Sequence, residues 1–86
     1  MIIKLYGAQR CHKTIYYQEL LLAKNIEFIF LDIEKNSQHA QELRKLYENK
    51  KLNFPTITIG EKKLRNPSNK ELNKWIDKLS IKKSAK

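Results

Sequence analysis

Two short apolar segments near the N-terminus, residues 1–6 and 28–33, are separated by a segment of helix length, and this order restricts the folds open to the chain. The first segment is rich in β-branched residues and stops at Gly7, which is typical of a strand. The second is a continuous apolar run, which predicts a strand covered on both faces. A strand–helix–strand unit favours a parallel pair of strands joined by a right-handed crossover.

Two helices are predicted before residue 50. Residues 12–24 favour the first helix, and its candidates for a buried side are Ile15, Leu20, Leu21 and Leu22. Asn25 follows at the position where a helix often ends in a left-handed conformation. Asn36 or Ser37 can cap the second helix. The apolar side chains of that helix recur at helical spacing, at Ala40, Leu43, Leu46 and Tyr47.

The last third of the chain predicts two strands and a helix. Residues 55–60 alternate between apolar and polar, which indicates a strand with one buried face. Residues 60–62 can turn tightly into a short strand at 63–65, and such a hairpin favours antiparallel pairing. Ser68 and Glu71 have the spacing of a capping box. The helix that follows has an apolar face made of Leu72, Trp75, Ile76 and Leu79.

The length of 86 residues allows one domain. We expect this domain to span residues 1–80 and residues 81–86 to form a basic tail, because the tail follows Leu79, the last periodic apolar position. The net charge is +9, and residues 62–86 carry nine of the eighteen Lys and Arg side chains against two acidic ones. Such a field can attract nucleic acid, an acidic protein or a small anion. Because no aromatic residue interleaves the tail, we expect a solvated basic face rather than a nucleic-acid site.

The chain has a single cysteine, Cys11, so it cannot form an internal disulfide, and we expect a reducing, cytoplasmic location. No apolar run approaches the roughly 18 residues of a membrane span, so we expect no membrane partner. The two histidines, His12 and His39, belong to no cluster with metal-ligand spacing, so we expect no metal. We expect a monomer.

Cys11 lies between the first predicted strand and the first predicted helix. The free amides and the positive partial charge of a helix N-terminus stabilise a thiolate over a thiol. Arg10, His12 and Lys13 add positive charge nearby. These features predict a redox-reactive thiol, and the alternative is an inert buried cysteine. Thr14 could donate a hydrogen bond to the thiolate or serve only as a neutral residue of the first turn.

Three features match one known family, namely Leu5-Tyr6-Gly7 leading to Cys11, the strand–helix–strand spacing to residues 28–32, and the run from Phe54 to Gly60. Through them, from Ile3 to about Leu79, the chain resembles the glutaredoxins, which are members of the thioredoxin fold. The resemblance and the predicted elements together indicate an α/β fold, in which a four-stranded mixed sheet and three helices follow the order β-α-β-α-β-β-α.

The resemblance also implies roles for individual residues. Cys11 would be the nucleophile, and Pro55 would be a cis proline packed beside it. Backbone groups of Phe54 would pair with an extended thiol substrate such as glutathione, the expected co-substrate. Further substrate-binding residues are expected around the cysteine and at the capped start of the last helix, which is an anion-binding surface; they are Arg10, His12, Lys13, Thr14, Ser68 and Asn69.

The sequence differs from the family pattern at two places. Many members have a second cysteine where Thr14 stands, so the motif of residues 11–14 is monothiol and also differs from the Cys-Gly-Phe-Ser motif of iron–sulfur relatives. A second thiol must then come from glutathione or from another protein. The usual Gly-Cys-Asp ahead of the last helix, which grips glutathione, is replaced by Arg-Asn-Pro-Ser-Asn at residues 65–69.

We therefore predict a monothiol glutaredoxin-like oxidoreductase in which the Cys11 thiolate exchanges with glutathione or protein mixed disulfides. One alternative is a redox-inactive binding or regulatory module that keeps the fold and uses its basic surface. Another is an arsenate-reductase-like protein, because residues 11–14 are similar to the Cys-x-Lys-Ser pattern of that group. Those proteins usually carry a longer helical insertion before the proline strand, for which this chain has no room.

Overall fold

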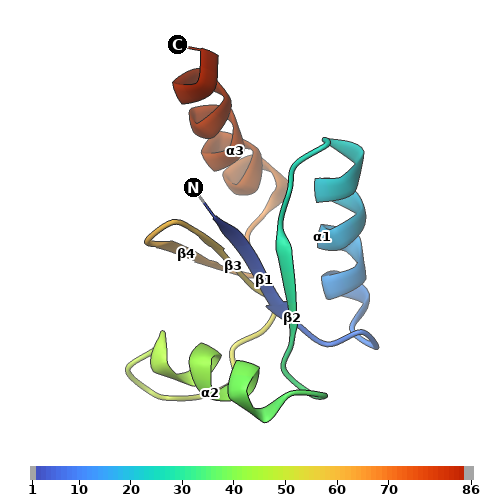
Figure 1. The fold of residues 1–86 in the computed structure, drawn as a ribbon, viewed down its shortest axis with the longest axis vertical. Helices are drawn as coiled ribbons and strands as arrows, with labels where there is room; N and C mark the ends of the chain where they lie inside the picture. The colour runs from blue at the N-terminus through green and yellow to red at the C-terminus, as the bar shows by residue number, and fades with distance from the viewer. Residues whose placement is uncertain (1, 85–86) are drawn as a thin grey trace.

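The computed structural model describes residues 2–84 and contains four strands and three helices (Figure 1). In chain order they are β1 (Ile3–Gly7), α1 (His12–Ala23), β2 (Ile29–Asp32), α2 (Ser37–Lys45), β3 (Thr56–Ile59), β4 (Lys62–Arg65) and α3 (Asn69–Ser84). The predicted order of elements is confirmed.

The strands form one mixed sheet in the order β2-β1-β3-β4. β1 pairs in parallel with β2, and it pairs antiparallel with β3 on its other side. β3 and β4 form the closing antiparallel hairpin. Leu5 shows the register, since it lies opposite Phe30 on one side and Ile57 on the other. The two central strands, β1 and β3, therefore carry the core.

The two faces of the sheet are covered by different helices. α1 and α3 cover one face, and their core cluster includes Leu5, Tyr17, Leu21, Ile57, Leu72 and Ile76. α2 covers the other face, and its cluster consists of Tyr6, Leu31, Ile33, Ala40 and Leu43. Figure 1 shows α2 set apart from α1 and α3, below the sheet in that view.

The burial of two strands differs from the sequence prediction. β2 is an edge strand, and Ile29 is 47% exposed, so the prediction that both faces of this strand are covered is wrong. β3 is central, and its threonines are buried as well as its isoleucines, so the prediction of one buried face is also wrong. The position of a strand in the sheet decides how much of it is covered, and the alternation of its residues does not encode that position.

The buried side of α1 consists of Thr14, Tyr17 and Leu21. Leu20 is half-buried against the same core, whereas Ile15 and Leu22 are 39% and 64% exposed, so the prediction that these two are buried is wrong. The rotation of the helix is set by what Thr14 and Tyr17 contact. The Thr14 side chain lies against Gly7, and the Tyr17 hydroxyl donates to the Pro67 carbonyl.

The structure has the predicted residues at the end of α1 and at the starts of α2 and α3. Asn25 follows α1 with a φ of 56°, in the left-handed region. Asn36, one of the two predicted caps, accepts a hydrogen bond from the Gln38 amide at 2.9 Å. Ser68 accepts one from the Glu71 amide at 3.1 Å, which is half of the predicted capping box.

α3 extends to Ser84, so it takes in residues 81–84 of the predicted tail, while residues 85–86 lie outside the described part. Leu72 and Ile76 are buried as predicted, and the Leu79 side chain lies outside the described ones. The division into a domain at residues 1–80 and a tail at residues 81–86 stays a prediction.

Gly7 allows α1 to approach the end of β1 closely. A Cβ atom built on Gly7 would lie 2.6 Å from Thr14 Cγ2 and closer still to the Thr14 hydroxyl oxygen. Thr14 is fully buried and its side chain is short, so it cannot move away. Only glycine therefore permits this packing.

Gly7→Ala is expected to lower the free energy of unfolding by about 1–3 kcal/mol, which is the usual cost of forcing an extra carbon into a packed core. Urea denaturation followed by circular dichroism measures it. The double variant Gly7→Ala with Thr14→Ala removes the atoms that clash, so it should lose less stability than the sum of the two single variants. Strict additivity would show that the two residues do not compete for space.

Candidate functional site

Cys11 is the residue that caps the start of α1, with φ −85° and ψ 120°. Its amide donates to the Ala8 carbonyl and its carbonyl accepts from the Ile15 amide, both at 3.0 Å. The thiol is half-buried and makes no capping hydrogen bond. The backbone thus holds the residue firmly, while the sulfur is left available at the end of the helix.

The surroundings of Cys11 favour its thiolate. Partial burial raises the pKa of the thiol, but this effect is outweighed by hydrogen bonding that the thiolate gains from the amide and hydroxyl of Thr14 and from the Lys13 amide. The charge of Arg10 lowers the pKa further. The net direction is a pKa below the ordinary value of a cysteine, as expected for a thiol at a helix N-terminus.

Thr14 is more than a neutral residue of the first turn. It is fully buried between α1 and the end of β1, and its hydroxyl accepts a hydrogen bond from the Ala8 amide at 3.3 Å. That bond leaves the hydroxyl proton free for the Cys11 sulfur. His12 and Lys13, by contrast, are exposed on the same turn, where they carry their side chains into solvent.

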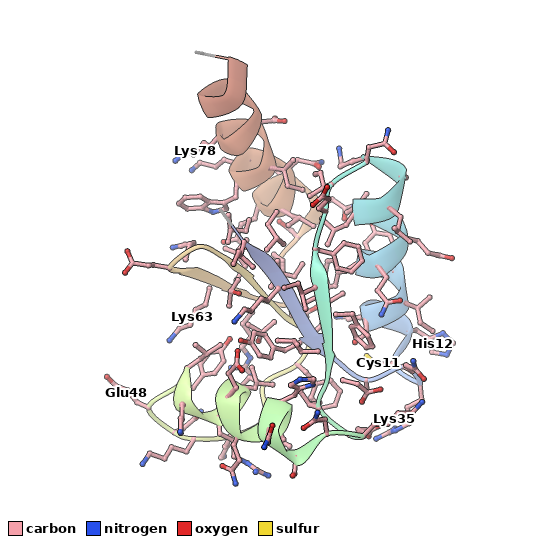
Figure 2. The ribbon with its side chains drawn as sticks, in the orientation of Figure 1. Cys11, His12, Lys35, Glu48, Lys63 and Lys78 are labelled. Atoms are coloured by element: carbon pink, nitrogen blue, oxygen red, sulfur yellow. The ribbon has the colours of Figure 1, made fainter. Side chains whose placement is uncertain are left out.

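Arg10 and the loop that holds it are tied to the loop after β2. The exposed Arg10 guanidinium pairs with Glu34, with Nε–Oε2 at 2.8 Å and the terminal nitrogen at 2.6 Å from the same oxygen. Lys35 donates from Nζ to Gln9 Oε1 at 2.7 Å. Figure 2 shows Lys35 at the same end of the molecule as Cys11. Glu34 offsets part of the positive charge of Arg10, and substrate binding by Arg10 stays a prediction.

The Phe54–Pro55 peptide bond is cis. β1 and β3 pair Tyr6 with Thr56, so the register continued by one residue places Pro55 opposite Gly7, at the carboxyl end of β1 where the loop to Cys11 begins. Pro55 is buried, whereas Phe54 is half-buried and packs into the cluster beneath α2. Direct contact between Pro55 and Cys11 stays a prediction.

The start of α3 is joined to α1 and to the proline segment. The Asn66 amide donates to the Pro55 carbonyl at 2.9 Å. The Tyr16 hydroxyl donates to Asn69 Oδ1. Ser68 and Asn69 therefore lie near the middle of α1 rather than its first turn. The Asn69 side chain already accepts a hydrogen bond from Tyr16. Their role in substrate binding stays a prediction.

Sequence reasoning missed Tyr16 and Tyr17, which connect α1 to the start of α3, and it missed the contact of Gly7 with Thr14. The two small residues Gly7-Ala8 ahead of Cys11 are a signal that could have indicated a close approach of backbone and helix. Nothing in the local pattern indicates the tyrosine contacts, because their partners lie about fifty positions further along the chain.

Among residues 2–84, no three side chains of His, Cys, Asp or Glu are grouped so as to hold a metal ion. Within the same part, no helix has both the length and the apolar character needed to cross a membrane.

The glutaredoxin family model matches residues 3–64, a range that includes Cys11 and Pro55. The chain belongs to the glutaredoxin family. No curated protein matches its sequence significantly. Family membership supports a thiol–disulfide oxidoreductase-like role and an association with glutathione or protein thiols.

Solved structures show the same fold. The glutaredoxin grx-1 from Archaeoglobus fulgidus matches with a TM-score of 0.73 and 18% identity, over 86% of this chain and 84% of that one. The thioredoxin-like protein BC3987 matches with a TM-score of 0.71 and 21% identity, over 84% of this chain and 96% of that one. A threonine-to-alanine variant of BC3987 matches equally well. The predicted thioredoxin-like fold is confirmed.

Thr14→Val is expected to raise the pKa of Cys11 by about one pH unit, because the thiolate loses one hydrogen bond to a neutral donor. The ultraviolet absorbance of the thiolate, followed over a pH titration, measures this pKa. Thr14→Ser keeps the hydroxyl and is the matched control, so its pKa should stay close to that of the unmodified protein. An unchanged pKa in the valine variant would contradict a role for the hydroxyl.

Proposed function

We propose that this glutaredoxin-family protein is a monothiol thiol–disulfide oxidoreductase and that Cys11 is its nucleophile. The observation that carries the proposal is the half-buried Cys11 thiol at the start of α1, where amides and the Thr14 hydroxyl lower its pKa. A lowered pKa raises the fraction of thiolate at neutral pH, and the thiolate is the attacking species in disulfide exchange.

The proposed reaction uses glutathione in two exchange steps. The Cys11 thiolate attacks the glutathione sulfur of a glutathionylated protein, so a Cys11–glutathione disulfide forms and the protein thiolate leaves. A glutathione thiolate then attacks the glutathione sulfur of this mixed disulfide, which releases oxidised glutathione and regenerates the Cys11 thiolate. One protein–glutathione disulfide is lost, one glutathione disulfide is formed and the protein thiol is released, so electrons balance.

The surroundings of Cys11 suit an anionic tripeptide such as glutathione. His12 and Lys13 extend from the first turn of α1 into solvent, and Lys35 lies at the same end of the molecule. These side chains can meet carboxylates of a substrate. The proline segment at Phe54–Pro55 would supply backbone groups to the peptide part, which is the arrangement that the family resemblance implies.

The sequence also allows two other functions. A binding or regulatory module without redox chemistry is favoured by one observation, the engagement of Asn69 by Tyr16 where the family usually grips glutathione. An arsenate-reductase-like function is disfavoured, because α2 is the single helix between β2 and β3. We also propose that the protein works in the cytoplasm as a monomer, since a lone thiol of this kind needs a reducing environment.

Alkylation of Cys11 by iodoacetamide is expected to reach half its maximal rate at a pH below the free-cysteine value of about 8.5 and to slow as the pH falls through the Cys11 pKa. The same preparation should reduce a glutathionylated peptide in the presence of glutathione. Cys11→Ser is the control and should abolish both reactions. An alkylation midpoint at or above the free-cysteine value, with no reduction of the glutathionylated peptide, would contradict the enzymatic proposal and favour a binding module.

Thr14→Cys is expected to give a dithiol that closes its own disulfide, because position 14 lies one turn along α1 from Cys11 and its side chain approaches the sulfur. Mass spectrometry after treatment with oxidised glutathione should show an internal disulfide without bound glutathione. The unmodified protein should instead carry one glutathione. A Thr14→Cys variant that also stays glutathionylated would mean that the two positions are misaligned.

A further inference from the structure

α2 covers only part of its face of the sheet. The cross-strand row Leu31–Tyr6–Thr56 lies beneath this helix, and Leu31 and Tyr6 belong to its core cluster. The next row toward the start of β1 joins Ile29, Lys4, Thr58 and Lys63 across all four strands. α2 reaches this row through Glu42, which pairs with Lys4, and through the Leu46 carbonyl at its end, which accepts from Lys63, so the helix covers the row only in part.

A groove of about 1170 Å³ lies along this row. Its floor is the sheet and its walls are the end of α2 and the β3–β4 hairpin; it is lined by Ile2, Lys4, Tyr6, Glu42, Lys45, Leu46, Thr58, Gly60, Glu61, Lys62 and Lys63. Figure 2 shows Lys63 between the hairpin and α2. The volume exceeds the roughly 300–1,000 Å³ of typical small-molecule pockets, so a peptide segment fits it better than a small ligand.

The groove carries a net positive charge, with four lysines against two glutamates. Glu42 is satisfied internally, since it accepts from the Tyr6 hydroxyl and pairs with Lys4 at 3.1 Å. Its hydrogen bond from Tyr6 holds the pKa of Glu42 below the ordinary value, so it stays a carboxylate. Lys45, at the end of α2, has no acidic partner among the described residues and adds to the field at that end of the groove.

Apolar side chains border the same groove. Ile2 is 59% exposed and Ile29 is 47% exposed, and Ile29 lies next to Lys4 in the cross-strand row. Two isoleucines open to water beside a cluster of lysines suit a partner that has both apolar and acidic side chains.

Nucleic acid fits this groove less well. The aromatic rings around it have lysines over their faces, with Lys63 at 4.6 Å from the Tyr47 ring centroid and Lys62 at 5.0 Å from that of Trp75. Tyr6, the aromatic residue among the described residues that line the groove, is buried, so bases would find no exposed ring there to stack on.

We propose that the groove between α2 and the β3–β4 hairpin docks an acidic amphipathic segment of a partner protein. Cys11 follows the carboxyl end of β1 and does not line the groove, which meets this strand at Lys4 and Tyr6. Figure 2 shows Cys11 and Lys63 on opposite sides of the view. Docking here leaves the thiol open and does not depend on its chemistry.

The test is an NMR titration of the isotope-labelled full chain. The probe is a synthetic amphipathic helical peptide with glutamates on one face and leucines on the other. Saturable shifts confined to the groove residues and to Ile29 are expected. Lys45→Glu and Ile2→Ser should each weaken binding about fivefold. The matched controls are Lys24→Glu and Leu22→Ser, which change an exposed lysine and an exposed leucine at the far end of α1, and they should bind as the unmodified protein does.

Two further probes decide between kinds of partner. The same peptide with glutamine in place of glutamate should not bind, and an oligothymidylate of similar charge should bind more weakly than the acidic peptide. Equal or tighter binding of the oligonucleotide, shifts spread over the whole surface, or equal weakening by the control variants would each overturn the proposal. None of these readouts involves Cys11, so they are independent of the thiol assays.

Discussion

The close approach of Thr14 to Gly7 is the contact on which the candidate site depends. It presses the first turn of α1 against the end of β1, where a glycine leaves room for the threonine side chain. The position of that turn then fixes Cys11 at the helix start, with the amides of the turn near its sulfur. The Thr14 hydroxyl contributes both to this packing and to the reactivity of Cys11, because it accepts a hydrogen bond from the Ala8 amide and stabilises the Cys11 thiolate. Packing and reactivity are thus coupled through one buried side chain.

The two faces of the sheet are used differently. α1 and α3 close one face over a continuous apolar core, and this rigid layer supports the thiol at the carboxyl end of β1. The other face is closed by α2 over only part of its length, and its open part carries lysines and exposed isoleucines. The first face holds the larger of the two apolar clusters. The second face can therefore leave polar surface open for a partner.

The order of elements was predictable because each element has its own hydrophobic period. α3 follows from apolar residues at helical spacing, and the strands follow from short β-branched runs. The errors concern burial. Ile29 was expected to be covered and is exposed, while Thr56 and Thr58 were expected to face solvent and are buried. Local alternation does not say which strand lies at the edge of a sheet, since that depends on pairing between segments distant in sequence.

The sequence by itself determined the order of strands and helices, the cap at Ser68, and the place of Cys11 at a helix start. These features depend on residues within a few positions of one another, so local propensity suffices. Tertiary structure decided the burial of Thr14, the pairing of Arg10 with Glu34 and the open groove beside α2. Each of these arises where segments far apart in the chain meet, because helix rotation and strand order minimise exposed apolar surface across the whole fold.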